Sequence, residues 1–255
     1  MGISAVVIAR DEEQRIQACL DSLSFADETV VVVDSRTVDG TAEAARRFTK
    51  KVYVLEWQGY GKTREEAVAR AKHEWILWLD ADERVPSELA EEILNVLQQE
   101  ADHVGYQMPR KAFFLGRWIR HGGWYPGYVT RLYKRDSASF TNSHVHEKLS
   151  VDGRIGTLKN DIHHYTDDTI QHYYDKWNLY TSLAAADISE HGKQFHLADL
   201  LFRPFFMFLK MYLFRLGFLD GMEGFMLAVF SAHYVYAKYA KLWELKRDKT
   251  VKRTF

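Results

Sequence analysis

Short apolar runs alternate with segments of helical periodicity through the first hundred residues. Continuous runs predict strands buried on both faces, and apolar residues three or four positions apart predict helices that cover those strands. The predicted strands are residues 3–8, 29–34, 52–55 and 75–79. The predicted helices contain Ile16, Leu20 and Leu23, then residues 42–48, then 62–74, and last Leu89, Ile93 and Leu97. This alternation predicts an α/β fold with a mostly parallel, doubly wound sheet.

The pattern changes after about residue 100. Four glycines break residues 113–128 into loops, and residues 129–135 (VTRLYKR) predict one more strand. From Leu200 the chain becomes strongly apolar and aromatic. Charged residues, among them Arg203, interrupt this stretch before it reaches the roughly 18 uncharged residues that a membrane-spanning helix needs. We therefore divide the chain into an α/β domain, residues 1–199, and an aromatic and basic helical region, residues 200–255.

Composition excludes several classes of protein. The 34 basic residues nearly balance the 35 acidic ones, so no overall field favours nucleic acid, and we expect none as a partner. The single cysteine, Cys19, excludes an internal disulfide framework and a cysteine-based zinc site. The N-terminal apolar run is only six residues long, with no basic residue before it. That is too short for a signal peptide, so we expect the chain to stay in the cytoplasm.

Charged residues gather at the carboxyl ends of the predicted strands, where open α/β sheets bind their ligands. Arg10 and Asp34 stand at the ends of the first two strands, and Asp80 and Asp82 follow the fourth. On an extended segment Asp80 and Asp82 point the same way, and two hard oxygen ligands suit Mg²⁺ or Mn²⁺ bridging a diphosphate. An acidic pair that only caps the next helix is the alternative.

Four motifs resemble those of a known enzyme family. VVIARDEE, VVVDSRTVDGT, KTREEAVARA and WILWLDADE, in this order, look like the family 2 inverting glycosyltransferases of GT-A fold. The later GGWYPGYVTRLYKR, HVHEKL and the aromatic tail resemble the bacterial subgroup that builds the lipopolysaccharide inner core, including its β-1,4-glucosyltransferases. The resemblance implies a metal-dependent hexosyltransferase and makes residues 1–199 its catalytic domain.

The family pattern implies a nucleotide-sugar site at the carboxyl edge of the sheet. Ala9 and Arg10 would line the nucleotide pocket, Asp34 would hydrogen-bond the uracil or the ribose, and Arg64 would lie beside the base. Without the resemblance, Arg10 and Arg64 are equally consistent with surface charges, and Asp34 with a turn or helix cap. The sequence departs from the residues common in the family at Arg36, Val38 and Glu65.

The same resemblance makes Asp82 the main metal ligand, with Asp80 contacting the ribose or the metal. His163 or His164 would add a ligand, since some GT-A enzymes recruit a late histidine, and a purely structural histidine is the alternative. The sequence contains no HExxH spacing, so a zinc hydrolase is not supported.

Inversion at an anomeric carbon requires a base that takes the proton of the acceptor hydroxyl. Relatives supply this base from the second half of the domain, and Glu147 in SHVHEKL is our candidate. If this segment is extended, His144 and His146 share one face and Glu147 lies opposite, so all three cannot serve one centre unless the segment bends. We expect the two histidines at the acceptor. A surface glutamate beside two partly buried histidines is the alternative.

Other acceptor contacts are expected from the glycine-bounded loop. Trp124 and Tyr125 would stack on a sugar ring there, unless they only anchor the loop to the core. Arg131 in VTRLYKR would reach a phosphate of the donor or the acceptor.

The C-terminal region combines aromatic with basic residues. Phenylalanines at 202, 205 and 206 have Arg203 between them, a mixture that suits helices lying at a membrane surface. After residue 237 there are seven lysines and arginines against two acidic residues, which favours an anionic leaflet. We expect peripheral association with the inner face of the cytoplasmic membrane, where a lipid-linked saccharide acceptor resides. A helical dimer interface, and thus a homo-oligomer, or a cap over the sheet is the alternative.

The resemblance implies an inverting transfer of a hexose, glucose from UDP-glucose, to an inner-core lipopolysaccharide sugar. An enzyme of the same fold that uses polyprenyl phosphate as acceptor is one alternative. Sugar nucleotidyltransferases form another class with paired aspartates on an α/β sheet, but they open with a Gly-rich GGxGTR loop that VIARDEE does not resemble. A non-catalytic carbohydrate or membrane scaffold is the third alternative.

Overall fold

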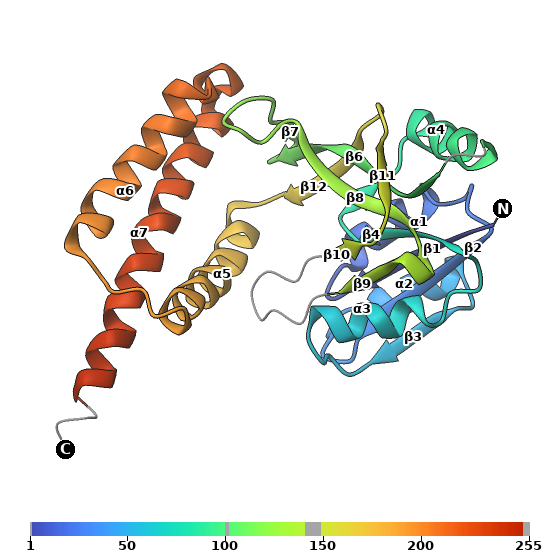
Figure 1. The fold of residues 1–255 in the computed structure, drawn as a ribbon, viewed down its shortest axis with the longest axis horizontal. Helices are drawn as coiled ribbons and strands as arrows, with labels where there is room; N and C mark the ends of the chain where they lie inside the picture. The colour runs from blue at the N-terminus through green and yellow to red at the C-terminus, as the bar shows by residue number, and fades with distance from the viewer. Residues whose placement is uncertain (1, 100–101, 141–148, 252–255) are drawn as a thin grey trace. The chain divides into compact units, whose positions relative to one another are not determined.

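The chain forms two compact units. The computed structural model describes residues 2–99, 102–140 and 149–251 (Figure 1). The first unit takes Met1–Lys111 and Gly127–Tyr165, and the second takes Ala112–Pro126 and Thr166–Phe255. Each unit is therefore assembled from two separate stretches of the chain.

Four parallel strands form the N-terminal part of the main sheet. In sheet order they are β3 (Val52–Leu55), β2 (Glu28–Asp34), β1 (Ile3–Ala9) and β4 (Trp75–Asp80). All seven residues of β2 are buried, and valines at successive positions suit a strand that is covered on both faces. The parallel sheet predicted for this part of the chain is confirmed.

Helices cover both faces of these strands. They are α1 (Glu13–Asp21), α2 (Thr41–Phe48), α3 (Tyr60–Val68) and α4 (Ser87–Gln98). Buried residues of α1, including Cys19, share one apolar cluster with Val7 and with residues of α2 and α4, whereas α3 shares another with Val6. Because Val6 and Val7 point to opposite faces of β1, the predicted doubly wound arrangement is confirmed.

Helix α3 ends at Val68, before the predicted end at Glu74. The backbone N–H of Lys72 donates to Glu28 Oε2 at 2.7 Å, and that of His73 donates to Ser4 Oγ at 3.0 Å. In a longer helix these N–H groups would instead donate to carbonyls four residues earlier. Hydrogen bonds to polar side chains of β1 and β2 therefore replace helical hydrogen bonds after Val68, and the helix ends before β4.

Antiparallel strands extend the sheet beyond β4. Strand β8 (Gly127–Lys134) pairs with β4 and corresponds to the strand predicted at 129–135, and β6 (His103–Phe114) pairs with β8. Strand β12 (Ile162–Asp167) comes next and pairs with the two-residue β5 (Glu83–Arg84). The smaller elements are β7 (Arg117–Trp118), η1 (Arg135–Ser137), β9 (Ala138–Phe140), β10 (Leu149–Val151) and β11 (Arg154–Thr157).

Three helices make up most of the second unit. Helices α5 (Ile170–Glu190) and α6 (Leu197–Leu209) both pack against α7 (Gly221–Val251). A π-helical turn η2 (Lys210–Phe214) and a 3-10 turn η3 (Gly217–Asp220) connect α6 to α7. Helix α5 belongs to this unit although it precedes residue 200. The boundary at residue 200 between a catalytic and a membrane-surface region stays a prediction.

One side of α6 exposes large apolar residues. Five of them are between 57% and 68% exposed, at the helical spacing that places them side by side: Leu197, Leu201, Phe202, Phe205 and Phe206. None of the helices in the described part of the chain combines the length and apolar character that a membrane crossing requires.

A buried carboxylate fastens the glycine-rich loop to the helices of the second unit. Asp220 is 2% exposed and accepts hydrogen bonds from the backbone N–H groups of Arg120 at 3.2 Å and His121 at 2.7 Å. Its Oδ1 also lies 3.0 Å from Nδ1 of His121. Next in the chain, the N–H of Gly122 donates to the carbonyl of Arg215 at 2.8 Å. A buried carboxylate needs such donors, so the loop and η3 stabilise each other.

Replacing Asp220 with alanine should lower the free energy of unfolding by about 2–3 kcal/mol, because two backbone N–H groups lose a charged acceptor. Urea denaturation followed by circular dichroism measures this loss. The matched control is Asp175→Ala on α5, whose exposed carboxylate accepts from Gln171 one turn earlier. Its effect should stay within about 0.5 kcal/mol, and equal losses in both variants would contradict the role given to Asp220.

Candidate active site

The parallel strands β1, β2 and β4 end at one edge of the first unit's sheet. In register, Ile8 of β1 lies between Val32 of β2 and Asp80 of β4. Arg10 follows β1 directly, while Asp34 and Asp80 are the last residues of their strands. The topology thus brings these three polar residues to the carboxyl edge, where open α/β sheets bind ligands.

Arg131 joins two carboxylates at this edge. Its Nη2 lies 2.5 Å from Asp80 Oδ2 and 2.7 Å from Glu83 Oε1. Glu83 is fully buried, and its other oxygen accepts the backbone N–H of Asp80 at 3.1 Å. Arg131 comes from β8, which runs beside β4 and so places the guanidinium next to Asp80. The predicted contact of Arg131 with a phosphate stays a prediction.

Burial and charge act in opposite directions on these two carboxyl groups. Burial alone would raise the pKa of Asp80, but the positive charges of Arg131 and Arg64 bring that pKa below its ordinary value. For Glu83, burial dominates and raises the pKa in spite of the attraction to Arg131. Asp80 is therefore held as an anion in an ion pair.

Asp82 is directed to a different partner. Its Oδ2 lies 3.3 Å from Nε2 of His164, and the two side chains are 11% and 16% exposed. Strand β12 brings the histidine there, because His164 pairs with Glu83 of β5 and the N–H of Tyr165 donates to the carbonyl of Asp82 at 2.9 Å. The structure thus places a carboxylate and an imidazole side by side at the mouth of the sheet.

The neighbouring His163 does not share this position. Adjacent residues on a strand point to opposite faces, and His163 lies where burial first, and then the positive charge of Lys111, lowers its pKa. Of the two histidines that the sequence offered as an additional metal ligand, His164 is the one beside Asp82.

The chemistry of Asp82 and His164 fits a divalent cation. Ligands about 2.1 Å from one ion and at right angles to each other are about 3 Å apart, close to the 3.3 Å that separates Asp82 Oδ2 from His164 Nε2. Among the described residues no group of three or more histidine, cysteine or acidic side chains is arranged around a common point. Mg²⁺ is commonly held by one or two carboxylates and completed by phosphate oxygens and water, so a small set of protein ligands is compatible with a divalent cation.

Asp34 forms an ion pair with Arg36, an arginine that the family pattern does not contain. The buried Asp34 carboxylate accepts from the backbone N–H of Arg36 at 2.9 Å and from its guanidinium, with Nη2 at 2.5 Å. The same guanidinium lies 5.5 Å from the centre of the Trp57 ring. Burial would raise the pKa of Asp34, but the bonds to Arg36 lower it below its ordinary value. Asp34 therefore presents a paired carboxylate at the edge.

The loops after β1 and β2 are tied to each other. Asp11 Oδ1 accepts the N–H of Val38 at 2.9 Å, and Asp39 Oδ2 accepts the N–H of Glu13 at 3.0 Å. Asp11 has a φ of 55°, a left-handed conformation that a short polar side chain tolerates better than most. These bonds fix the loop that carries Arg36 against the loop that carries Arg10.

Arg64 and Ala9 are two further residues predicted to bind the nucleotide sugar. Arg64 on α3 lies 5.0 Å from the Trp78 ring and 5.8 Å from the Phe140 ring. Ala9 ends β1 and is buried in the core. The positive charge of Arg64 thus lies near the end of β4, where it also lowers the pKa of Asp80.

The other predicted site residues lie in the second unit or outside the described residues. Trp124 and Tyr125 belong to the second unit, where Tyr125 packs edge-on against Trp118 at 5.4 Å. His144, His146 and Glu147 lie outside the described residues. Their predicted roles at the acceptor and as the base stay predictions.

Sequence reasoning assigned no role to Glu83 or to Arg36. Glu83 lies inside the quoted motif WILWLDADE, three residues after Asp80. A third acidic residue so close to the pair, with an arginine on a nearby strand, was the available signal for an ion-pair cluster. Arg36 was noted as a departure from the motif, but its partner is visible only in the structure.

Comparison with known proteins finds relatives of this chain. The model of "Glycosyl transferase family 2" matches residues 4–150. An uncharacterised glycosyltransferase of Rickettsia typhi is 30% identical over 95% of this chain and 87% of its own length. The lipopolysaccharide core biosynthesis glycosyltransferase LpsC of Rhizobium meliloti is 28% identical over 95% of this chain and 92% of its own.

A solved structure has the same fold. The mannosyltransferase PcManGT of Pyrobaculum calidifontis, in complex with GDP-Man and Mn²⁺, aligns with a TM-score of 0.54. The alignment covers 94% of this chain and 86% of that one at 14% identity. At this identity the likeness concerns the fold alone, and it confirms the fold class predicted from the sequence.

Removing the charge of Arg131 tests the ion-pair cluster. Arg131→Met should lower the free energy of unfolding by about 3 kcal/mol, since it leaves the buried Glu83 without its cation. The control is Lys134→Met on the same strand, whose partner Glu74 is half exposed, with a loss under about 1 kcal/mol. Urea denaturation of the full chain compares them. Adding Glu83→Met to Arg131→Met should recover part of the loss, and a further loss would contradict the pairing.

Proposed function

Because the chain belongs to glycosyl transferase family 2, we propose that this glycosyltransferase moves glucose from UDP-glucose, with inversion, onto a lipopolysaccharide core saccharide. The observation that carries the proposal is the Asp82–His164 pair at the carboxyl edge of a GT-A sheet. The likeness to LpsC over nearly the full length of both chains supports a core saccharide as acceptor.

Asp82 and His164 are the proposed protein ligands of Mg²⁺ or Mn²⁺. The bound cation would neutralise the negative charge that builds on the departing diphosphate. Arg131 and Glu83 hold Asp80 in place near this pair, and Asp80 would contact the ribose or the metal. The Mn²⁺ in the PcManGT complex supports a divalent cation in this fold.

The nucleotide is proposed to lie over the ends of β1 and β2. Ala9 and Arg10 would line its pocket, Asp34 would contact the uracil or ribose, and Arg64 would lie near the base. Arg36 is already bonded to Asp34, so the proposal implies that a nucleoside meets the carboxylate and the guanidinium together. Burial of Asp34 and the tied loops around it hold this surface in one conformation.

Transfer requires the acceptor hydroxyl oxygen to attack the anomeric carbon as that carbon's bond to the diphosphate oxygen breaks. Glu147 is the proposed base that takes the hydroxyl proton, with His144 and His146 beside it at the acceptor. This assignment depends on the sequence resemblance, because these residues lie outside the described part of the chain.

A membrane surface is the proposed place of the reaction. The exposed apolar side of α6 and the excess of lysine and arginine after residue 237 support contact with anionic lipids. A lipid-linked saccharide would then meet the enzyme at the surface in which it is anchored.

The metal ligands can be tested with two adjacent histidines. His164→Ala and Asp82→Ala should each lower metal-dependent glucose transfer at least about 100-fold, because a metal ion contributes several kcal/mol to the transition state. Release of UDP from UDP-glucose, measured with and without Mn²⁺, reports the effect. His163→Ala is the matched control and should retain activity, since its side chain points to the opposite face of β12. Equal losses at both histidines would exclude a specific role for His164.

Lipid contact can be tested on α6. The double variant Phe202→Asp/Phe205→Asp should reduce sedimentation with phosphatidylglycerol vesicles at least about tenfold, because buried apolar area and attraction to anionic lipid both decrease. Leu179→Asp on α5 is the control for a single substitution, since Leu179 is 57% exposed and is likewise an apolar residue replaced by aspartate. A wild-type protein that stays in the supernatant, or a control that loses as much binding, would contradict a membrane-facing side on α6.

A further inference from the structure

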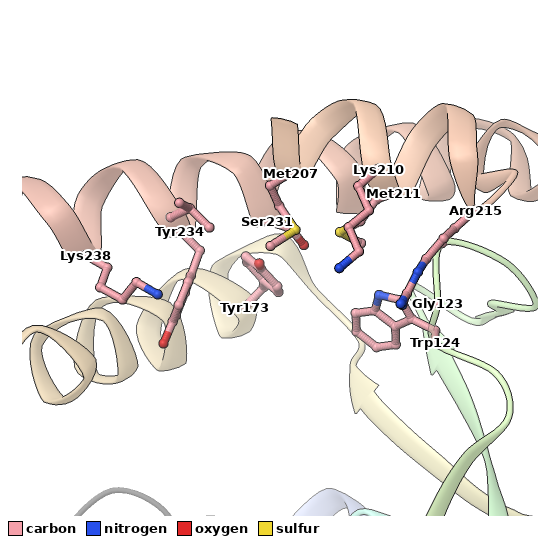
Figure 2. Close-up of a pocket in the computed structure, with 12 residues that line it drawn as sticks. Gly123, Trp124, Tyr173, Met207, Lys210, Met211, Arg215, Ser231, Tyr234 and Lys238 are labelled. Atoms are coloured by element: carbon pink, nitrogen blue, oxygen red, sulfur yellow. The ribbon is translucent and has the colours of Figure 1, made fainter. Parts of the chain in front are cut away.

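A cavity of about 450 Å³ lies within the second unit. Residues of α5, α6, η2 and α7 and the glycine-rich loop line it (Figure 2). Three of its lining residues are basic, Lys210, Arg215 and Lys238, and three are aromatic, Trp124, Tyr173 and Tyr234. No acidic residue is among the described residues that line it.

The three cations lack a carboxylate partner in the part of the chain that the structure describes. Within the described ranges, Lys210, Arg215 and Lys238 form no ion pair with an acidic side chain. Figure 2 shows the side chains of Lys210 and Arg215 extending toward Trp124, and the amino group of Lys238 lying beside Tyr234. Three positive charges around one cavity attract an anion, and the aromatic walls limit its hydration.

Lys238 is held where its charge is disfavoured. Burial lowers its pKa, and the positive charges of Arg203 and Lys193 lower it further. An anion in the cavity would relieve both effects. The protein therefore keeps a cation at a position that a negatively charged ligand would stabilise.

The loop is shaped to let Arg215 approach. Gly123 has a φ of 85°, and a Cβ at this position would overlap the guanidinium of Arg215. The N–H of the preceding Gly122 donates to the carbonyl of Arg215 at 2.8 Å. Asp220 fastens the same loop to η3, so the backbone around Arg215 and the loop that faces it are held by the fold.

Aromatic rings offer surfaces for a sugar. Trp124 lies beside Arg215 in Figure 2, and Tyr173 lies across the cavity on α5. The Tyr173 ring is supported by Phe230 at 4.9 Å, and Tyr234 donates to the carbonyl of Tyr180 at 3.2 Å. Supported rings beside cations suit a ligand that has both a sugar face and a negative charge.

We propose that this cavity binds the negatively charged group of a saccharide, a phosphate or a carboxylate, and that this saccharide is the acceptor. That this saccharide is the acceptor depends on the proposed function, whereas the binding of an anionic saccharide in the cavity does not. The acceptor would therefore be an anionic saccharide, and Lys210, Arg215 and Lys238 would bind its negatively charged group.

Isothermal titration calorimetry on the full chain tests the proposal with glucose 6-phosphate as the probe. We expect saturable binding of glucose 6-phosphate, weaker binding of inorganic phosphate and glycerol 3-phosphate, and none of glucose at the same concentration. The double variant Lys210→Gln/Lys238→Gln should weaken the binding at least about tenfold, since charge-assisted hydrogen bonds are lost. Arg215→Gln provides a second, independent variant with the same expected direction.

The control is Arg247→Gln, which removes one exposed positive charge from the same helix α7 and should bind like the wild type. Loss of a disfavoured cation at Lys238 should not unfold the protein, and thermal denaturation of each variant checks this. Equal weakening in Arg247→Gln, or glycerol 3-phosphate binding as tightly as glucose 6-phosphate, would overturn the proposal.

A further variant separates this inference from the proposed function. Asp82→Ala should lose metal-dependent transfer but keep its affinity for glucose 6-phosphate, because Asp82 belongs to the first unit. Loss of glucose 6-phosphate binding in Asp82→Ala would place the probe in the donor site and overturn the cavity proposal. If the wild-type chain binds glucose 6-phosphate but transfers no glucose, only the proposed function is refuted.

Discussion

The guanidinium of Arg131 is the interaction on which the acidic edge of the sheet depends. Asp80, Asp82 and Glu83 put three carboxylates within four residues of sequence, and like charges this close disfavour one another. Arg131 reaches two of them from β8, the antiparallel strand next to β4. Its ion pairs therefore join the parallel and antiparallel parts of the sheet at the edge where a ligand is expected.

In this arrangement the three carboxylates have different partners. Glu83 is buried and holds Asp80 through its backbone N–H as well as through Arg131. Asp82 is left to face His164, which β12 delivers by pairing with β5. A cluster that would otherwise repel itself thus provides one carboxylate paired with Arg131 and one that faces His164.

The parallel part of the fold was predictable because its signals are local. Valines at consecutive positions of β2 and apolar residues on one side of α4 report burial directly. Features that depend on distant partners were not predictable: the end of α3 is set by Ser4 and Glu28, and the choice of His164 is set by strand pairing. Helix α5 was missed because its buried positions are small or polar, Thr181, Ala185 and Ser189, so that no apolar stripe marks it.

The interleaving of the two units along the chain constrains how the protein can be dissected. The polypeptide passes from one unit to the other after Lys111, after Pro126 and after Tyr165. A chain truncated after Tyr165 would keep both stretches of the first unit, but also the segment Ala112–Pro126, which would have lost the rest of its own unit. Functional separation of the helices from the sheet calls for point substitutions or for rejoined, circularly permuted chains instead of a terminal deletion.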